Sequence, residues 1–175
     1  MTQLVVEAPA QVLAETFEDL YRRTFPRVYA YVASLVRDQS AAEEVTAQAF
    51  ERAYRKRGSY RPRRGSPEAW LFGIARNAAL DELRRLKRRA PLEVDPEDDD
   101  AVAPEDHAEG VVRRETVRAA LASLDPRERE LVALKYRGGL SNVEIARVLG
   151  MSESNVGTRL HRAMETLRRE CDERA

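Results

Sequence analysis

Polar side chains suited to base pairs and phosphates share one face of the last helix that the sequence predicts. Those near its N-terminal end are Ser154, Asn155, Thr158, Arg159, His161 and Arg162. Arginine can read guanine and asparagine can read adenine in the major groove, each through two hydrogen bonds. Serine, threonine and helix N-terminal amides can hold phosphates, and for His161 a contact with the DNA backbone is favoured over metal binding. We therefore predict a helix that reads duplex DNA, against the alternative of an ordinary amphipathic surface helix.

The residues around the start of this helix have the pattern of a helix-turn-helix. Ser141 and Glu144 have the spacing of a capping box that opens a short helix. Gly150 can take the left-handed conformation that ends this helix, and Ser152 caps the next one at once. The apolar residues of the last helix recur at helical spacing, at Val156, Leu160, Ala163 and Leu167. These signals predict two helices that cross at a steep angle.

A second set of candidate DNA-binding residues lies around a basic loop at 55–65. In the loop they are Arg57, Ser59, Tyr60, Arg61, Arg63 and Arg64. On one face of the helix that follows they are Asn77, Asp81, Arg84, Arg85 and Arg88. Arginine binds phosphates and a tyrosine among basic residues can stack on an unpaired base, so we predict a surface for single-stranded DNA. A solvated basic loop is the alternative, and Trp70 is interpreted as a core residue rather than a strand-separating wedge.

Three predicted helices position this basic surface. The first has apolar residues at spacings of three and four, and Pro26 is expected to kink or split it. These apolar residues are Phe17, Leu20, Tyr21, Val28, Tyr31, Val32 and Leu35. Ser40 and Glu43 predict a capping box for a second helix that runs to about Lys56. Ser66 is expected to cap a third helix with Pro67 at its first position, which gives a small three-helix bundle.

Residues 91–110 divide the chain into two parts. They include nine acidic residues, three prolines and no lysine or arginine, which predicts a flexible linker. Residues 51–90 carry 13 basic and 4 acidic residues, so the net charge of zero hides blocks of opposite sign. After the linker we expect a helix over roughly 111–124, and then one opened by Asp125 and Pro126 that ends at Gly138. The predicted fold is all-α, with helical domains at 1–90 and 111–175 joined by this linker.

Several functional classes find no support in the sequence. Cys171 is the single cysteine, which excludes an intrachain disulfide and a thiolate zinc site. Asp98, Asp99 and Asp100 lack the alternate spacing of a calcium loop, so we expect neither a metal nor a cofactor. No apolar stretch approaches the roughly 20 residues that span a bilayer, so we expect a cytoplasmic protein without membrane insertion. No set of residues suggests a nucleophile with its base, so we do not expect an enzyme.

Longer stretches of the chain carry a family resemblance. FEDLYRRTFPRVYAYV, AAEEVTAQAF and AWLFGIARNAALDELRR precede LDPRERELVALKYRGGLSNVEIARVLGMSESNVGTRLHRAMETLRR in the chain. In this order they resemble domains two and four of the extracytoplasmic-function sigma factors of bacterial RNA polymerase. The resemblance implies that the basic loop with Asn77 captures the melted −10 element and that the last helix reads the −35 element. It also implies an acidic linker that runs toward the active centre and RNA exit path, and an anti-sigma factor as a further partner.

The resemblance also implies contacts with core RNA polymerase, at the coiled coil of the largest subunit and at the flap region. The helix at 41–56 would dock on the coiled coil through Glu43, Glu44, Gln48 and Glu51. The chain has Ala47-Gln48 where the family usually has Gln-Glu, and Gly157 where it usually has lysine. The glycine removes a phosphate contact and costs about 1 kcal/mol of helix propensity. The second functional hypothesis is an autonomous helix-turn-helix regulator, against which the basic loop argues.

Overall fold

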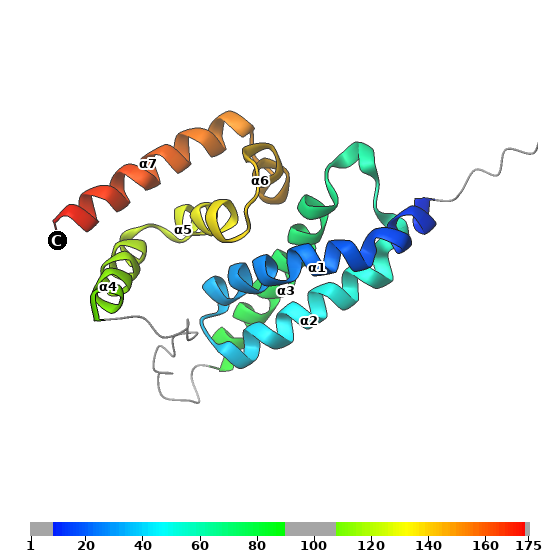
Figure 1. The fold of residues 1–175 in the computed structure, drawn as a ribbon, viewed down its shortest axis with the longest axis horizontal. Coiled ribbons are helices and arrows are strands. Elements are labelled where there is room, and N and C mark those ends of the chain that lie inside the picture. The colour runs from blue at the N-terminus through cyan, green and yellow to red at the C-terminus, as the bar shows by residue number, and fades with distance from the viewer. Residues whose placement is uncertain (1–8, 90–107, 174–175) are drawn as a thin grey trace, which may run out of the picture.

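The computed structural model describes residues 9–89 and 108–173, and their regular secondary structure is entirely helical, which confirms the predicted all-α class (Figure 1). The first group of helices is α1 (Pro9–Val36), α2 (Gln39–Lys56) and α3 (Pro67–Arg89), with two 3-10 turns, η1 (Arg57–Ser59) and η2 (Pro62–Arg64), between α2 and α3. The second group is α4 (Ala108–Ser123), α5 (Pro126–Val132), the π-helical turn η4 (Ala133–Arg137), α6 (Asn142–Leu149) and α7 (Glu153–Asp172).

The helices α1, α2 and α3 pack on one another as the predicted bundle. Of the two outcomes predicted for Pro26, a kink or a split, the split does not occur, because α1 continues through the proline as one helix. Leu20 and Val28 on either side of the proline are buried, and this packing stabilises the helix across the one backbone hydrogen bond that proline cannot make. Tyr21, expected in the core, is 42% exposed and packs at its edge, 4.8 Å from the ring of Phe50.

The caps of α2 and α3 test two local predictions. The predicted Ser40 cap is wrong, because Asp38 is the N-cap and its carboxylate accepts from the Ala41 amide at 2.6 Å. The positive φ of 57° at Arg37 turns the chain so that Asp38 has the extended conformation that an N-cap needs. The Ser66 cap is confirmed, since its hydroxyl accepts from the Ala69 amide at 3.1 Å and α3 begins at Pro67.

The boundaries of the second group differ from those expected in one place. α4 begins at Ala108, so the last three residues predicted as linker belong to a helix, and residues 91–107, with Asp98, Asp99 and Asp100, lie outside the described residues. The Asp125 cap is confirmed, because its carboxylate accepts from the Glu128 amide at 2.9 Å. The helix that it opens widens into the π-helical turn η4 before Gly138.

One continuous apolar core joins the two groups of helices. It includes Leu71 and Phe72 of α3 together with Leu134 of η4 and Ile145 of α6, all of them fully buried. α6 packs against α3 and η4 packs against α1, so α5 and α6 lie between α7 and the first bundle (Figure 1). The two helical groups are therefore in direct contact in this structure.

Candidate nucleic-acid interface

The helix-turn-helix is built by caps at both of its helices. The Ser141 hydroxyl accepts from the Glu144 amide at 3.3 Å, and the Glu144 carboxylate accepts from the Ser141 amide at 2.8 Å. Gly150 ends α6 with φ 66° and ψ 40°, and Ser152 opens α7 by accepting from the Asn155 amide at 3.2 Å. All three predicted signals are confirmed. They hold α6 and α7 in contact and leave the N-terminal end of α7 at the turn.

The two faces of α7 are separated as the spacing predicts. Val156, Leu160 and Ala163 are buried, and Leu167 is partly buried against the same core. The predicted recognition residues Ser154, Asn155, Thr158, His161 and Arg162 are exposed, while Arg159 is half-buried. Asn155 accepts from Arg159 Nε at 3.1 Å, and His161 lies 3.3 Å from the Glu165 carboxylate. A hydrogen-bonding face therefore remains open on the end of α7 that can enter a major groove.

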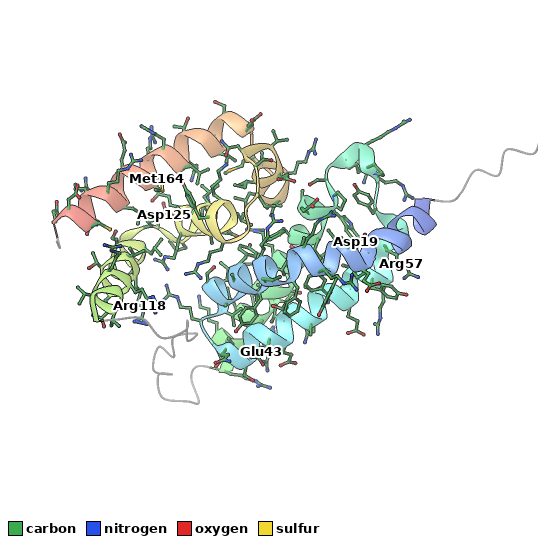
Figure 2. All side chains as sticks on the ribbon, viewed as in Figure 1. Asp19, Glu43, Arg57, Arg118, Asp125 and Met164 are labelled. Carbon is green, nitrogen blue, oxygen red and sulfur yellow. The ribbon has the colours of Figure 1, made fainter. Side chains whose placement is uncertain are left out.

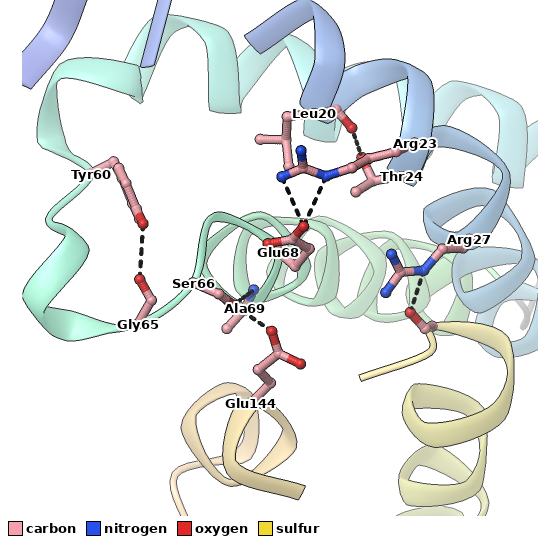
Figure 3. A network of polar contacts seen from close by, with 11 residues as sticks. Leu20, Arg23, Thr24, Arg27, Tyr60, Gly65, Ser66, Glu68, Ala69 and Glu144 are labelled. Carbon is pink, nitrogen blue, oxygen red and sulfur yellow. Dashed lines mark hydrogen bonds and ion pairs between the residues drawn. The ribbon is translucent and has the colours of Figure 1, made fainter. Parts of the chain in front are cut away.

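The basic loop has a buried aromatic ring and an exposed cationic rim. Tyr60 is 8% exposed, and its hydroxyl donates to the Gly65 carbonyl at 3.0 Å (Figure 3). Its ring lies 5.6 Å from that of Trp70, and burial, with the nearby Glu68 carboxylate, raises the pKa of its hydroxyl. The exposed residues are Ser59, Arg61, Arg63 and Arg64, with Arg57 half-buried. In this state the loop presents arginines to a polyanion, whereas Tyr60 is not free to stack on a base.

The predicted strip on α3 is assembled on one side of the bundle. Asn77, Asp81, Arg84 and Arg88 are exposed and Arg85 is half-buried. Arg84 donates to Asp81 at 3.0 Å, and Arg85 donates to Glu82 at 2.7 Å, which lowers the pKa of the Glu82 carboxyl. Two of the three arginines are thus held by neighbouring carboxylates on the same helix.

The predicted polymerase-docking residues lie along α2. Glu43, Glu44 and Glu51 are exposed and Gln48 is half-buried. Gln48 donates to Glu44 at 3.2 Å, and Arg55 donates to Glu51 at 2.5 Å. Glu43 lies toward the start of the helix, and Arg57, in the basic loop, lies beyond its other end (Figure 2). Glu43 and Glu44 therefore lie at the end of α2 away from the basic loop, whereas Glu51 lies near the loop.

Sequence reasoning missed the polar contacts between the two helical groups. Glu130 of α5 accepts from Tyr31 and Arg76 of the first bundle, and Arg27 donates to the Gly138 carbonyl at 2.7 Å. Ser66 donates to Glu144 at 2.5 Å (Figure 3). The two residues of each contact are 54 to 111 positions apart in the chain, so no local pattern could reveal the pairs. The one local sign was the acidic Glu130 next to the apolar Leu131 and Val132.

The carboxyl of Glu144 accepts hydrogen bonds from both helical groups. Its partial burial would by itself raise its pKa, but the hydrogen bonds from Ser66 and Ser141 outweigh the burial and the net pKa is lowered. One carboxylate therefore caps α6 and joins α6 to the first turn of α3.

Residues 9–89 and 108–173 contain neither a metal-binding cluster nor a membrane span. No group of three or more histidine, cysteine or acidic side chains in these ranges is placed to hold a metal ion. None of the helices described is both long and apolar enough to cross a lipid bilayer.

Comparison with known proteins accounts for most of the chain. The family described as Sigma-70 region 2 matches residues 20–89, and the family described as Sigma-70, region 4 matches residues 114–167. The ECF RNA polymerase sigma factor SigK of Mycobacterium sp. (strain KMS) is 32% identical over 165 residues, which cover 88% of this chain and 82% of the relative. The chain belongs to the extracytoplasmic-function group of the sigma-70 family. It is thus a sigma factor, a protein that directs transcription initiation.

A second relative agrees with this placement, and two solved sigma factors share the fold. The ECF RNA polymerase sigma factor SigE of Mycolicibacterium smegmatis is 35% identical over 163 residues, covering 90% of this chain and 62% of the relative. The fold is similar to that of RpoE from Bartonella quintana, solved with the anti-sigma factor NepR, with a TM-score of 0.73, 24% identity, and 90% of this chain and 98% of that chain covered. It is also similar to CnrH, solved with the cytosolic domain of CnrY. The TM-score is 0.68 and the identity 23%, and the match covers 97% of this chain and 100% of CnrH.

Proposed function

We propose that this sigma factor binds core RNA polymerase and grips a promoter at two points. The exposed face of α7 reads the −35 element as duplex DNA, and the basic loop with the α3 strip captures the melted −10 element. α2 docks on the coiled coil of the largest polymerase subunit, and the second helical group contacts the flap region. We divide the chain accordingly into a domain at 1–90, a linker at 91–107 and a second domain that begins with α4 at Ala108. The protein acts in the cytoplasm and has no catalytic activity of its own.

The observation that carries the proposal is the pairing of two sigma-70 regions with two open polar surfaces. Region 2 covers the bundle that bears the basic loop, and region 4 covers the helix-turn-helix. Each region contains one of the surfaces predicted to bind nucleic acid. An autonomous helix-turn-helix regulator is less favoured, because it would need only the second region.

Run-off transcription with purified core polymerase tests the proposal. Adding the full chain to core polymerase and a library of native promoter fragments is expected to give discrete transcripts that core polymerase alone does not make. Glu43→Arg and Glu44→Arg together should abolish them, because the exposed acidic side chains proposed to meet the polymerase would be reversed. Glu18→Arg is the matched control, since Glu18 is an exposed acid on another helix. An absence of promoter-dependent transcripts under all conditions would refute the proposed two-point promoter grip.

An anti-sigma factor is a further proposed partner. RpoE and CnrH, which share the fold, were solved with NepR and with part of CnrY. This chain has an open groove of about 900 Å³ between the α1–α2 corner and the second helical group. Apolar and aromatic side chains line it, among them Val117, Leu121, Tyr136, Met164 and Leu167. Such unpartnered apolar surface supports a protein partner. Affinity capture of the chain from its own cells should recover a protein that inhibits run-off transcription, and recovery of polymerase alone would argue against it.

A further inference from the structure

Glu130 is buried at the boundary between the two helical groups, and its side chain is hydrogen-bonded to Tyr31 and Arg76 of the opposite group. It lies on α5 and is 9% exposed. The hydroxyl of Tyr31 on α1 donates to Glu130 Oε1 at 3.0 Å. Arg76 on α3 donates from Nε to Oε1 at 2.6 Å and from Nη2 to Oε2 at 3.2 Å. Three helices from both halves of the chain therefore meet at one carboxylate.

Further contacts extend this boundary toward the helix-turn-helix. Arg27 donates to the Gly138 carbonyl at 2.7 Å, and Ser66 donates to Glu144 at 2.5 Å. A β-carbon at Gly138 would lie 2.9 Å from the Phe72 ring, so the backbone of one half is close-packed on a side chain of the other. Arg147 of α6 lies against Gly65 at the end of the basic loop. The helix-turn-helix and the basic loop are thus held together directly.

This closed arrangement does not match the spacing of the two promoter elements. Elements centred near −35 and −10 are about 25 base pairs apart, which is about 85 Å at 3.4 Å per base pair. Here α6 touches residues 65 and 66, and α7 begins just beyond α6, so the end of the basic loop and the N-terminal end of α7 are about two helix diameters of about 10 Å each apart. The strip on α3 follows the loop along a helix of 23 residues, which is about 35 Å long and also far shorter than 85 Å. The two halves must therefore separate before both elements can be bound.

We propose that the Tyr31–Glu130–Arg76 cluster is a latch that holds the two promoter-reading halves closed in the free protein, and that promoter binding requires its opening. The second part of this proposal, that promoter binding requires opening, rests on the proposed two-point grip. The first part, that the latch holds the halves closed, concerns the free chain alone. In the absence of DNA and polymerase, the closed state keeps the basic loop and the helix-turn-helix too close together to bind one promoter.

The chemistry of the cluster suits a contact that must open. When the halves separate, water can solvate Glu130, Arg76 and the Tyr31 hydroxyl, which offsets much of the lost interaction. An apolar contact of similar size would gain no such compensation. Removing only one charge of the pair destabilises the closed state, because the remaining charge stays buried without a partner as long as the halves are closed. The latch therefore specifies the closed state and costs less to open than an apolar contact of its size would.

The test measures the distance between the halves in the full chain, without DNA or polymerase. Cys171 on α7 is the native cysteine, and Asp19 on α1 is exposed, so Asp19→Cys gives a pair of sites for spin labels. Double electron–electron resonance on the otherwise unchanged chain is expected to give one narrow distance distribution. Glu130→Arg should raise the ratio of open to closed molecules at least tenfold, as a single hydrogen bond to a charged group can shift an equilibrium by that factor.

Three further variants make the result specific to the latch. Arg76→Glu combined with Glu130→Arg should restore the narrow distribution, because the opposite charges again face each other. Glu130→Leu combined with Arg76→Met should also stay closed and should need more protein than wild type for half-maximal transcription, because an apolar contact gains nothing from water on opening. Glu18→Arg, which reverses an exposed charge paired with Arg22 on α1, should leave the distribution unchanged.

A broad distribution in the unchanged chain, or the same distribution in Glu130→Arg as in wild type, would overturn the proposal. If circular dichroism shows that Glu130→Arg has lost helix, Glu130→Gln takes its place, since it keeps the shape and removes the charge. A several-fold rise in the open fraction of Glu130→Gln supports the latch, and no rise overturns it. Because these measurements contain no promoter, they can fail while run-off transcription succeeds, and the reverse also holds.

Discussion

Gly157 gives the sharpest quantitative test of how α7 is built. It is the fifth residue of a 20-residue helix, and its φ is not among the positive values of the chain. A β-carbon added there would meet only Asn142 Nδ2, at 3.8 Å, which is an ordinary van der Waals contact. The position therefore needs neither the conformational freedom nor the small size of glycine.

Gly157→Ala is expected to raise the free energy of unfolding by about 1 kcal/mol, because glycine costs this much relative to alanine inside a helix. For a chain of this length the corresponding rise in melting temperature is about 2–4 °C. Urea denaturation followed by circular dichroism measures the first quantity, and calorimetry measures the second. A loss of stability would refute the reasoning, since it would mean that α7 requires a glycine at this site.

Gly157→Lys separates helix stability from DNA contact at the same position. Alanine and lysine have similar helix propensities, so both variants should gain similar stability. Only the lysine adds a charge near the proposed phosphate contacts, so it should steepen the slope of log K against log salt by about 0.9 and strengthen binding to all duplex sequences. Gly157→Gln is the uncharged control of similar length. Equal salt slopes for lysine and glutamine would show that residue 157 does not face the DNA backbone.

Three other substitutions test the site and its supports. Arg159→Ala should weaken duplex binding by about 1–3 kcal/mol and relax specificity at one base pair in a promoter-variant binding assay, whereas Arg168→Ala, at the far end of α7, should do neither. Gly150→Ala should lower the free energy of unfolding in urea by about 1–2 kcal/mol, because the φ of 66° is unfavourable for a residue with a β-carbon and no neighbour crowds the site. The pKa of the Glu144 carboxyl is lowered in the folded protein, so its ionised form stabilises the fold at pH values above its ordinary pKa of 4.5. This stabilisation is lost as the pH falls through the lower pKa of the folded state. The free energy of unfolding of Glu144→Gln should therefore depend less on pH below 4.5 than that of the wild type. An unchanged pH dependence would contradict that cause.

Features set by a few neighbouring residues were predictable from the sequence. The caps at Ser66, Ser141 and Ser152 and the left-handed Gly150 follow from hydrogen bonds or backbone conformations that span three or four residues. The wrong prediction of a cap at Ser40 also concerns a local backbone conformation. Asp38 takes the cap because the preceding turn places its backbone in the extended region, and the sequence alone did not reveal that turn.

Features set by packing were harder to predict. Pro26 is compatible with one continuous helix because buried residues on both sides hold the backbone in place, and α4 extends three residues into the acidic stretch. The burial of Tyr60 depends on Trp70 and on the Gly65 carbonyl, so composition alone could suggest only that the ring is available. The residue assignments for promoter and polymerase remain predictions, whereas the family follows from matches across both halves of the chain.

The contacts of the basic loop connect its state to that of the helix-turn-helix. The Tyr60 hydroxyl is anchored on the Gly65 carbonyl, Gly65 lies against Arg147, and Ser66 is hydrogen-bonded to Glu144. Separation of the halves removes both α6 contacts from residues 65 and 66, the segment on which the tyrosine is anchored. The movement proposed to let α7 reach a distant −35 element would leave the Tyr60 contacts with Trp70 and Gly65 in place but remove the α6 side chains that pack against residues 65 and 66. Opening of the proposed latch would therefore free the end of the basic loop and the helix-turn-helix in one step, because α6 carries the contacts between them.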